Sequence, residues 1–456
     1  MNATPAPIPA RQKRLLEGPV AATLASIAAP GLVLAIVQSS VSFADAWFVG
    51  RIGTDALAGL SMVFPLIALM QMMSAGAVGG GVSSSIARAL GAGNVARAEA
   101  LAAHAIIIAI GFGLIFTAVV LTAGPTLFRL LGGNAAAVAQ AVDYASIVFG
   151  GAVVVWICNV LGNIVRGSGN LAVPAVVLGG ACAVQIALTG ALVLGFGPFP
   201  RMGITGAAIG YLCGFATGMA GFIGYLALGA SGIRFRWRTF RPDARLFGEI
   251  LRVGLWSSLN AVLTVATALV VTGYVGTFGT AALAGYGVGM RLELLQVPFV
   301  FALGAALVAM VGTAVGAGDL TRARRASWIG GGLAAAMTGI VGLIVALQPQ
   351  WWTGMFSTDP AVLDAGYRYL RIVGPCYAFL GLGIALYFAS QGTGRIFWPV
   401  AAGSMRFVIA AIGGYAVVHL LHGSLDALFG VIAVALAVFG LGVAAATHWG
   451  VWRGPR

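Results

Sequence analysis

The chain of 456 residues alternates long apolar runs with short polar connections along nearly its whole length. A helix that spans the hydrocarbon core of a membrane needs about 20 consecutive, mainly apolar residues. Because the runs are continuous and do not alternate with period two, they favour membrane helices over a β-barrel. The pattern predicts twelve spans, at residues 20–46, 56–80, 101–123, 138–160, 171–196, 204–228, 250–274, 282–311, 327–348, 366–388, 398–421 and 427–450.

The composition supports an all-α integral membrane protein. Hydrophobic residues make up 60% of the chain and charged residues 8%, whereas about 25% of the residues of a soluble domain are charged. The four cysteines each lie inside an apolar run, and none belongs to a C-x-x-C motif, so we expect buried packing thiols. The four histidines and twelve acids are scattered, and we expect no catalytic site, metal site or cofactor.

The net charge of +13 does not point to nucleic acid, because most Arg and Lys residues lie in the short connections between apolar runs. Such placement is typical of the positive-inside rule. It predicts that both termini are cytoplasmic, with a basic cytoplasmic linker at residues 231–249 beside the anionic inner leaflet. The richness in Ala, Gly and Arg, with a single Lys, suggests a GC-rich bacterial genome, and we expect a multi-pass protein of the bacterial cytoplasmic (inner) membrane.

The two halves of the chain repeat. The segment VGRIGTDALAG (49–59) matches VGTFGTAALAG (275–285) at eight of eleven positions, and RALGAGNVARA (88–98) matches TAVGAGDLTRA (313–323) at six. Six helices separate the copies, so the repeat is parallel, with a pseudo-twofold axis along the membrane normal. We therefore predict an N-lobe at 1–230 and a C-lobe at 250–456, with substrate bound between them, as in a transporter.

Several motifs identify a family. FADAWFVGRIGTDALAG, FPLIALMQMMSAGAVGGG, SIARALGAGN, GPFPRMGITGAAIG, YGVGMRLELLQVP and VGTAVGAGD resemble multidrug and toxic compound extrusion (MATE) proteins, in particular the DinF-like branch. The resemblance implies two six-helix lobes arranged as a V. It also implies an antiporter that exports small organic, often cationic, compounds against protons or sodium by alternating access. We expect a monomer in the lipid bilayer.

Asp45 is the acid of the first-helix motif, and the resemblance makes it the ion-coupling residue. An ionised carboxylate at membrane depth is costly, so such residues usually face a cavity and serve a function. Its repeat partner is Val271, so the ion site needs to occur only once. The alternative is an interfacial Asp45 that pairs with Arg51. Ser42 and Gln38 lie three and seven residues before Asp45 and can share its helix face.

The fifth span departs from the DinF-like pattern. The usual N-x-x-x-D phrase is replaced here by Gln185 and Thr189, so the second carboxylate of that network is missing. A proton site is therefore favoured over a sodium site, which needs several oxygen ligands. Gln185, Thr189, Ser42 and Tyr144 can still supply some of these ligands.

A candidate substrate cleft combines four further polar residues within the apolar spans: Asn260, Thr264, Arg291 and Glu293. Arg291 and Glu293 are two residues apart and do not face one another on a helix, so each needs another partner. A structural ion pair and a substrate contact remain equally open for Glu293. Ordinary hydrogen bonding between helices explains Asn260 and Thr264 almost as well.

Two other functions compete with efflux. A flippase for lipid-linked precursors, from the same superfamily, would hold pyrophosphate with a cluster of cations in its cavity. Arg291 and Arg406 keep this alternative open, although most arginines lie in the predicted cytoplasmic loops. An integral-membrane enzyme would need a cluster of His, Asp and Glu at one membrane face, and none is apparent in the sequence.

Overall fold

The computed structural model describes residues 10–130, 134–229, 232–233, 240–450 and 452, and these residues include no β-strand. The first half contains α1 (Ala10–Glu17), α2 (Val20–Gly50), α3 (Thr54–Gln71), a π-helix η1 (Met72–Ala77), α4 (Val78–Gly91), α5 (Val95–Leu130), α6 (Ala135–Gly150), α7 (Ala152–Gly167), α8 (Ala172–Leu194) and α9 (Ile204–Ala227). The second half contains α10 (Ala244–Gly276), α11 (Thr280–Gly316), α12 (Leu320–Leu347), α13 (Gln350–Thr353), α14 (Pro360–Val373), η3 (Gly374–Cys376), α15 (Tyr377–Thr393), α16 (Phe397–Val408), η4 (Ile409–Gly413), η5 (Ala416–Leu420) and α17 (Leu425–Trp449).

The predicted all-helical membrane fold is confirmed. In the described part of the chain eleven helical segments are long and apolar enough to cross a membrane, and the bent pair α6–α7 raises the number to twelve. Large apolar side chains on α5 are exposed, among them Leu114 (56%), Ile115 (55%) and Val119 (56%). Such a surface is unusual for a protein in water and suits contact with lipid.

Two of the predicted spans contain a sharp bend or a 3-10 turn. The span at 138–160 bends by 50° between α6 and α7, next to Gly151. The span at 366–388 consists of α14 and α15, joined by the 3-10 turn η3 that contains Pro375. A proline has no backbone N–H to donate, so the α-helical hydrogen bonding stops there.

The chain divides into two compact units. The N-unit comprises residues 29–254, and the C-unit comprises residues 255–450 together with the N-terminal segment 10–28. The predicted lobes had a different division, with residues 1–230 in one and 250–456 in the other. The predicted linker at 231–249 lies partly outside the described residues, and its last part, from Ala244, is the beginning of α10.

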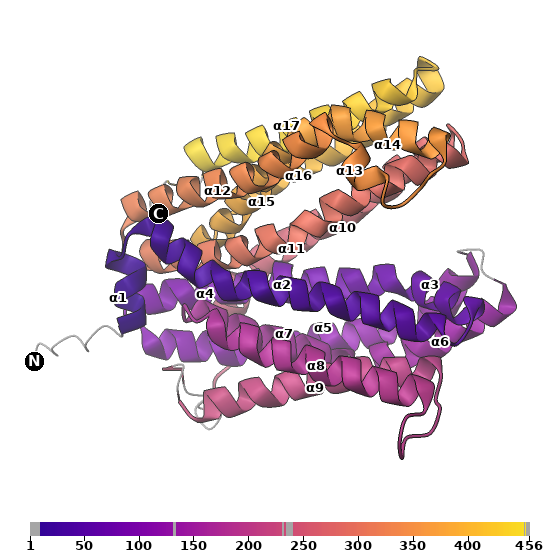
Figure 1. Ribbon diagram of the computed structural model, residues 1–456. Coiled ribbons are helices and arrows are strands. Elements are labelled where there is room, and N and C mark those ends of the chain that lie inside the picture. The colour runs from indigo at the N-terminus through magenta and orange to yellow at the C-terminus, as the bar shows by residue number, and fades with distance from the viewer. Residues whose placement is uncertain (1–9, 131–133, 230–231, 234–239, 451, 453–456) are drawn as a thin grey trace, which may run out of the picture. The chain divides into compact units, whose positions relative to one another are not determined.

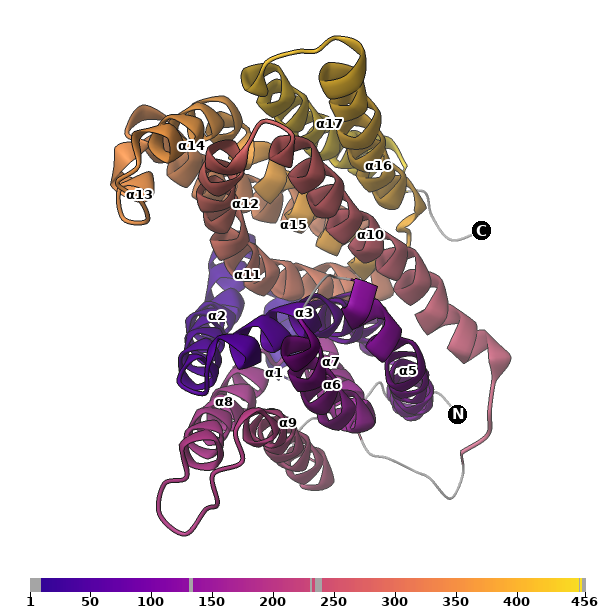
Figure 2. The same cartoon turned by 90° about the vertical axis from the view of Figure 1, so that its right-hand side faces the viewer.

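Each unit has its own hydrophobic core. In the N-unit Trp156 is fully buried and stacks on Phe112, with 5.0 Å between the ring centroids. In Figures 1 and 2, α8 and α9 of this unit lie side by side, as their dense packing requires. In the C-unit α15 packs against α11, α12 and α17, and α16 lies beside α17 (Figures 1 and 2).

The repeated Gly-Ala-Gly motif forms the same turn in both halves. Gly93 and Gly318 adopt φ values of 72° and 81°, in the left-handed region that glycine occupies without strain. The following residue begins the next helix, because Asn94 and Asp319 each accept a hydrogen bond from the backbone N–H three residues later. Both motifs therefore make a tight turn between two helices.

Candidate functional site

Asp45 is half-buried near the C-terminal end of α2, within the N-unit. Its Oδ2 accepts a hydrogen bond of 2.9 Å from Gln185 Nε2 on α8. Its Oδ1 is buried and has no hydrogen-bond partner among the described residues. The alternative pairing with Arg51 is not formed, because the Arg51 guanidinium lies over the ring of Trp47, 4.4 Å from the centroid.

Side chains from three other helices lie within interaction range of the carboxylate. Thr189 lies one turn beyond Gln185 on α8, close enough to interact with Asp45, and its buried Oγ1 also has no hydrogen-bond partner in the described part of the chain. Tyr144 from α6 and Tyr211 from α9 are buried and lie within electrostatic range of the carboxylate. Of the predicted neighbours, Gln185 is hydrogen-bonded to Asp45, Thr189 is close enough to interact with it, and Tyr144 is within electrostatic range.

The other two predicted neighbours are not hydrogen-bonded to the carboxylate in the described residues. Gln38 and Ser42 are exposed on α2, and neither is hydrogen-bonded to Asp45 within the described ranges. A shared helix face follows from sequence spacing, but the direction of the Asp45 side chain follows from its packing against α8.

Two glycines on α9 allow α8 to approach and place these side chains. A Cβ atom at Gly210 would lie 2.3 Å from Thr189 Oγ1, and one at Gly214 would lie 2.8 Å from the Cβ of Gln185. Small residues at such contacts let the backbones of membrane helices come close together. The position of the Asp45 partners on α8 thus depends on glycine at these two positions of α9.

Gly210→Ala is expected to displace Thr189 and to destabilise the N-unit by about 1–3 kcal/mol, the usual effect of overpacking. Thermal unfolding in detergent measures the change, and Gly224→Ala on the same helix is the control, because a Cβ there meets nothing within 4 Å. Equal melting temperatures for the two variants would contradict the proposed role of Gly210.

A hydrogen-bonded network that the sequence analysis missed lies within range of Asp45. Tyr211 OH accepts from Gln71 Nε2 at 2.8 Å, and Gln71 Oε1 accepts from Asn159 Nδ2 at 2.8 Å. Asn159 Nδ2 also donates to Ser74 Oγ at 2.8 Å, and Ser74 belongs to the π-helix η1. Short π-helical segments within α-helices occur frequently at functional sites.

Sequence signals for this network exist. Gln71 and Ser74 interrupt an apolar run three residues apart. Asn159 interrupts another together with Asn163 at i, i+4, and Asn163 Nδ2 donates to the carbonyl oxygen of Ala75 in η1 at 3.1 Å. Each pair can share one helix face. Only the tertiary structure shows that side chains of α3, η1, α7 and α9 are joined by hydrogen bonds.

The C-unit contains a different acidic cluster. Glu293 on α11 forms an ion pair with Arg406 on α16, with 3.2 Å between Oε1 and Nη2, and both side chains are largely buried. Tyr369 OH on α14 lies 3.4 Å from Glu293 Oε2. Glu293 thus has a partner other than Arg291, as its spacing on the helix required.

The repeat places a tyrosine beside the acid in each unit. Tyr144 and Tyr369 occupy matching positions; Tyr144 lies near Asp45 and Tyr369 near Glu293. Val271, which matches Asp45, is 3% exposed and belongs to the apolar core of the C-unit. One unit therefore has an acid without a cationic partner, and the other has an acid that is paired with its own arginine.

The four cleft candidates are not brought together. Arg291 is exposed, and its guanidinium lies 5.4 Å from the ring centroid of Phe356. Thr264 donates to the backbone carbonyl of Asn260 at 2.8 Å. The Asn260 side chain lies against α16, where a Cβ at Gly403 would be 2.1 Å from its Oδ1. Thr264 is therefore hydrogen-bonded within its own helix, and Asn260 packs against a neighbouring helix of the C-unit.

A family model matches the chain twice. The MatE model covers residues 30–189 and 257–416, one match in each half of the chain. These two matches agree with the internal repeat.

Similar proteins cover most of the chain. A protein of Shewanella oneidensis named FAD transporter is 28% identical over 82% of this chain and 82% of its own length. A probable multidrug resistance protein NorM of Thermotoga maritima is 26% identical over 83% of this chain and 81% of its own length. The solved structure of a MOP superfamily transporter from Pyrococcus furiosus has a TM-score of 0.89 and 22% identity, and covers 98% of this chain and 99% of that one.

Proposed function

Because the chain belongs to the MatE family, whose members are membrane transporters and not enzymes, we propose that it exports organic compounds in exchange for protons. The observation that carries the proposal is the Asp45 carboxylate within a membrane-spanning helix. One of its oxygens is held by Gln185, and the other is buried without a partner in the described residues. A carboxylate in that position is costly when ionised, which favours a role in function.

A proton suits this site better than a sodium ion. Hard cations take about six or more oxygen ligands. In the described N-unit only Asp45 Oδ1 and Thr189 Oγ1 are buried side-chain oxygens without a hydrogen-bond partner. A proton needs one oxygen, and a protonated Asp45 becomes a donor for which the Thr189 hydroxyl is a suitable acceptor.

Alternating access follows from this exchange. Protonation removes the charge of Asp45 and changes its hydrogen bonds to α8, which favours a different packing of α2. Pro30 lies inside α2 and supplies a position where the helix can bend. A cationic substrate then competes with the proton, because the two favour opposite charge states of the same carboxylate.

The substrate class is proposed as organic cations, with a flavin dinucleotide as the second candidate. The multidrug resistance relative supports the first, and the Shewanella oneidensis relative named FAD transporter supports the second. The flippase alternative is weaker, because Arg406 is neutralised by Glu293, and Arg291 extends from another face of α11 over Phe356.

We further propose a monomer of the DinF-like branch in the cytoplasmic membrane of a bacterium. The excess of Arg and Lys in alternate connections supports cytoplasmic termini. The terminal residues 1–9 and 453–456, to which this orientation refers, lie outside the described residues.

The test uses inside-out vesicles that contain the full chain. A proton gradient and a sodium gradient are imposed separately, and their discharge is followed after addition of ethidium or of FAD. We expect ethidium to discharge the proton gradient alone. Discharge of only the sodium gradient would overturn the proton proposal, and a response to FAD without one to ethidium would overturn the cationic substrate.

A further inference from the structure

The two units exchange the beginnings of their first long helices. The boundary between the units falls between Ala28 and Ala29 in α2, and between Gly254 and Leu255 in α10. The boundary in α2 and the boundary in α10 are separated by the same number of residues as Asp45 and Val271. The two boundaries therefore lie at equivalent positions of the repeat. The start of each half's first long helix therefore belongs to the unit that is built mainly from the other half.

In the C-unit the exchanged segment is residues 10–28, and Arg322 on α12 holds it. Arg322 Nε donates to the carbonyl oxygen of Leu15 at 2.7 Å, and Nη2 donates to that of Gly18 at 2.6 Å. These carbonyls lie at the junction of α1 and α2, where the end of a helix leaves acceptors without intrahelical donors. Leu15 and Leu24 are at most 1% exposed, so apolar packing supports the same attachment.

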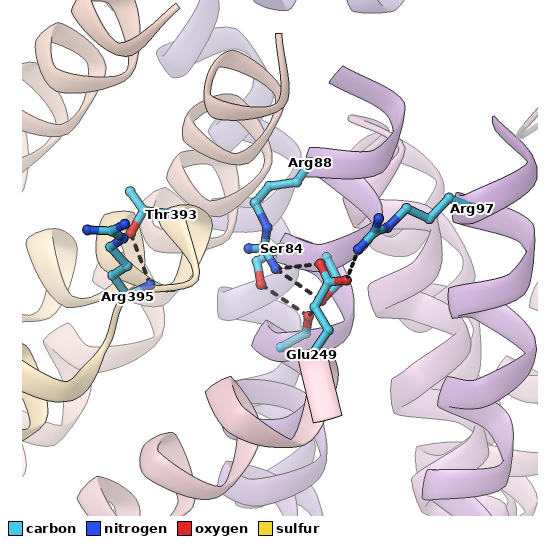
Figure 3. A network of polar contacts seen from close by, with 8 residues as sticks. Ser84, Arg88, Arg97, Glu249, Thr393 and Arg395 are labelled. Carbon is cyan, nitrogen blue, oxygen red and sulfur yellow. Dashed lines mark hydrogen bonds and ion pairs between the residues drawn. The ribbon is translucent and has the colours of Figure 1, made fainter. Parts of the chain in front are cut away.

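In the N-unit the exchanged segment is residues 244–254, and two arginines hold it (Figure 3). Glu249 on α10 is bound by Arg88 at 3.0 Å and by Arg97 at 2.7 Å. The backbones also lie close together at the end of the segment, because a Cβ at Gly254 would lie 3.1 Å from the Cα of Val78.

The residues just before this segment are attached to the same unit. His104 on α5 accepts a hydrogen bond of 2.9 Å from the backbone N–H of Asp243. The imidazole also contacts Phe247, with 4.5 Å between the ring centroids. Asp243 and the first three turns of α10 are thus fixed to the N-unit by side chains of α4 and α5.

The two attachments are related by the repeat. Arg97 and Arg322 are equivalent residues, in RALGAGNVARA and TAVGAGDLTRA. Each follows the same glycine turn and an N-capping residue, which is Asn94 in one half and Asp319 in the other. Arg97 binds a carboxylate of α10, whereas Arg322 binds backbone carbonyls near the start of α2. The same position therefore binds the start of the other half's first long helix in both units, although the acceptor groups differ.

We propose that Arg97 and Arg322 are paired anchors, so that during transport residues 10–28 move with the C-unit and residues 244–254 move with the N-unit. Any relative motion of the two units must then be absorbed where α2 and α10 pass from one unit to the other. Helix-weakening residues lie at both places, namely Pro30 in α2 and Gly254 in α10. Each segment is expected to move with its unit whatever compound and ion are exchanged.

Spin-label distances in the full-length protein test this assignment, after the four native cysteines have been replaced by serine and transport has been verified. Labels are placed through Glu17→Cys, Ala96→Cys, Arg245→Cys and Thr321→Cys, all at exposed positions. Ala96 and Thr321 are equivalent in the repeat. The pairs 17–321 and 96–245 lie within one unit each, and the pairs 17–96 and 245–321 connect different units.

On a change of pH or addition of ethidium, we expect unchanged mean distances for 17–321 and 96–245 and shifted distances for 17–96 and 245–321. The opposite result, with 17–96 constant and 17–321 shifted, would overturn the proposal, because segment 10–28 would then move with its own half. Constant distances for all four pairs in a transporting protein would also overturn it.

The anchoring role of Arg322 is tested separately in the protein that carries the pair 17–321. Arg322→Ala is expected to broaden the distribution of that distance, because the carbonyls of Leu15 and Gly18 lose their donor. Arg325→Ala, at an exposed position on the same helix, is the matched control and is expected to leave the distribution unchanged. Equal distributions for the two variants would show that Arg322 is not an anchor.

Discussion

Asp45→Asn is expected to reduce proton-coupled transport to the level of vesicles without the protein, while membrane insertion and thermal stability stay close to those of the wild type. Asparagine has nearly the same size and can still accept the hydrogen bond from Gln185 through its side-chain oxygen. It cannot take up or release a proton, so it cannot exchange charge with a substrate. The expected loss is therefore one of coupling and not of folding.

Gradient discharge by ethidium in inside-out vesicles measures this loss, with protein levels matched by quantitative blotting. Asp55→Asn is the control, because Asp55 is an exposed acid at the start of α3 that accepts a hydrogen bond from Asn134. We expect the control to transport normally. Normal transport by Asp45→Asn would mean that Asp45 is not the coupling residue.

Glu293→Gln is expected to destabilise the C-unit by about 3–5 kcal/mol, because it leaves the largely buried Arg406 without its counter-charge. The double variant Glu293→Gln/Arg406→Gln is expected to recover a large part of that loss, since no unpaired charge then remains. Such recovery would identify a structural ion pair, and it would decide between the two roles that the sequence leaves open for Glu293.

Thermal unfolding of the purified variants measures both effects, and transport is followed in parallel. The control is Asp364→Asn, which removes one partner of the exposed pair with Arg368 and should change the stability by about 1 kcal/mol or less. If Glu293→Gln has the stability of the wild type but an altered range of exported compounds, Glu293 is a substrate contact.

The structure confirms most of what the sequence predicts about the fold, because membrane helices leave a strong local signal. A hydrocarbon environment requires each spanning segment to satisfy its own backbone hydrogen bonds, so length and apolarity suffice to locate a helix. The bend at Gly151 and the turn at Pro375 were not predicted, although both residues are visible in the sequence. A glycine or proline within an apolar run is compatible with a straight, a bent or an interrupted helix.

The division into units could not be predicted from the sequence. Residues 10–28 begin the first half of the chain, and residues 244–254 begin the second half, yet each segment packs with the other half's unit. Charge and hydropathy indicate where a helix begins but not which core its beginning joins. That choice depends on contacts between residues far apart in the chain, such as Arg322 with Leu15 and Glu249 with Arg97.

The sequence by itself determined the class of protein, the membrane spans and the repeat, because each depends on residue type and on spacing along the chain, and it singled out Asp45 as a candidate. Only the tertiary structure decided which side chains meet: Gln185 and Thr189 with Asp45, Gln71 with Tyr211, and Arg406 with Glu293. The physical reason is that spacing defines the face of a single helix. A partner on another helix depends on how closely the two helices pack and how each is rotated about its axis, and small residues such as Gly210 control both.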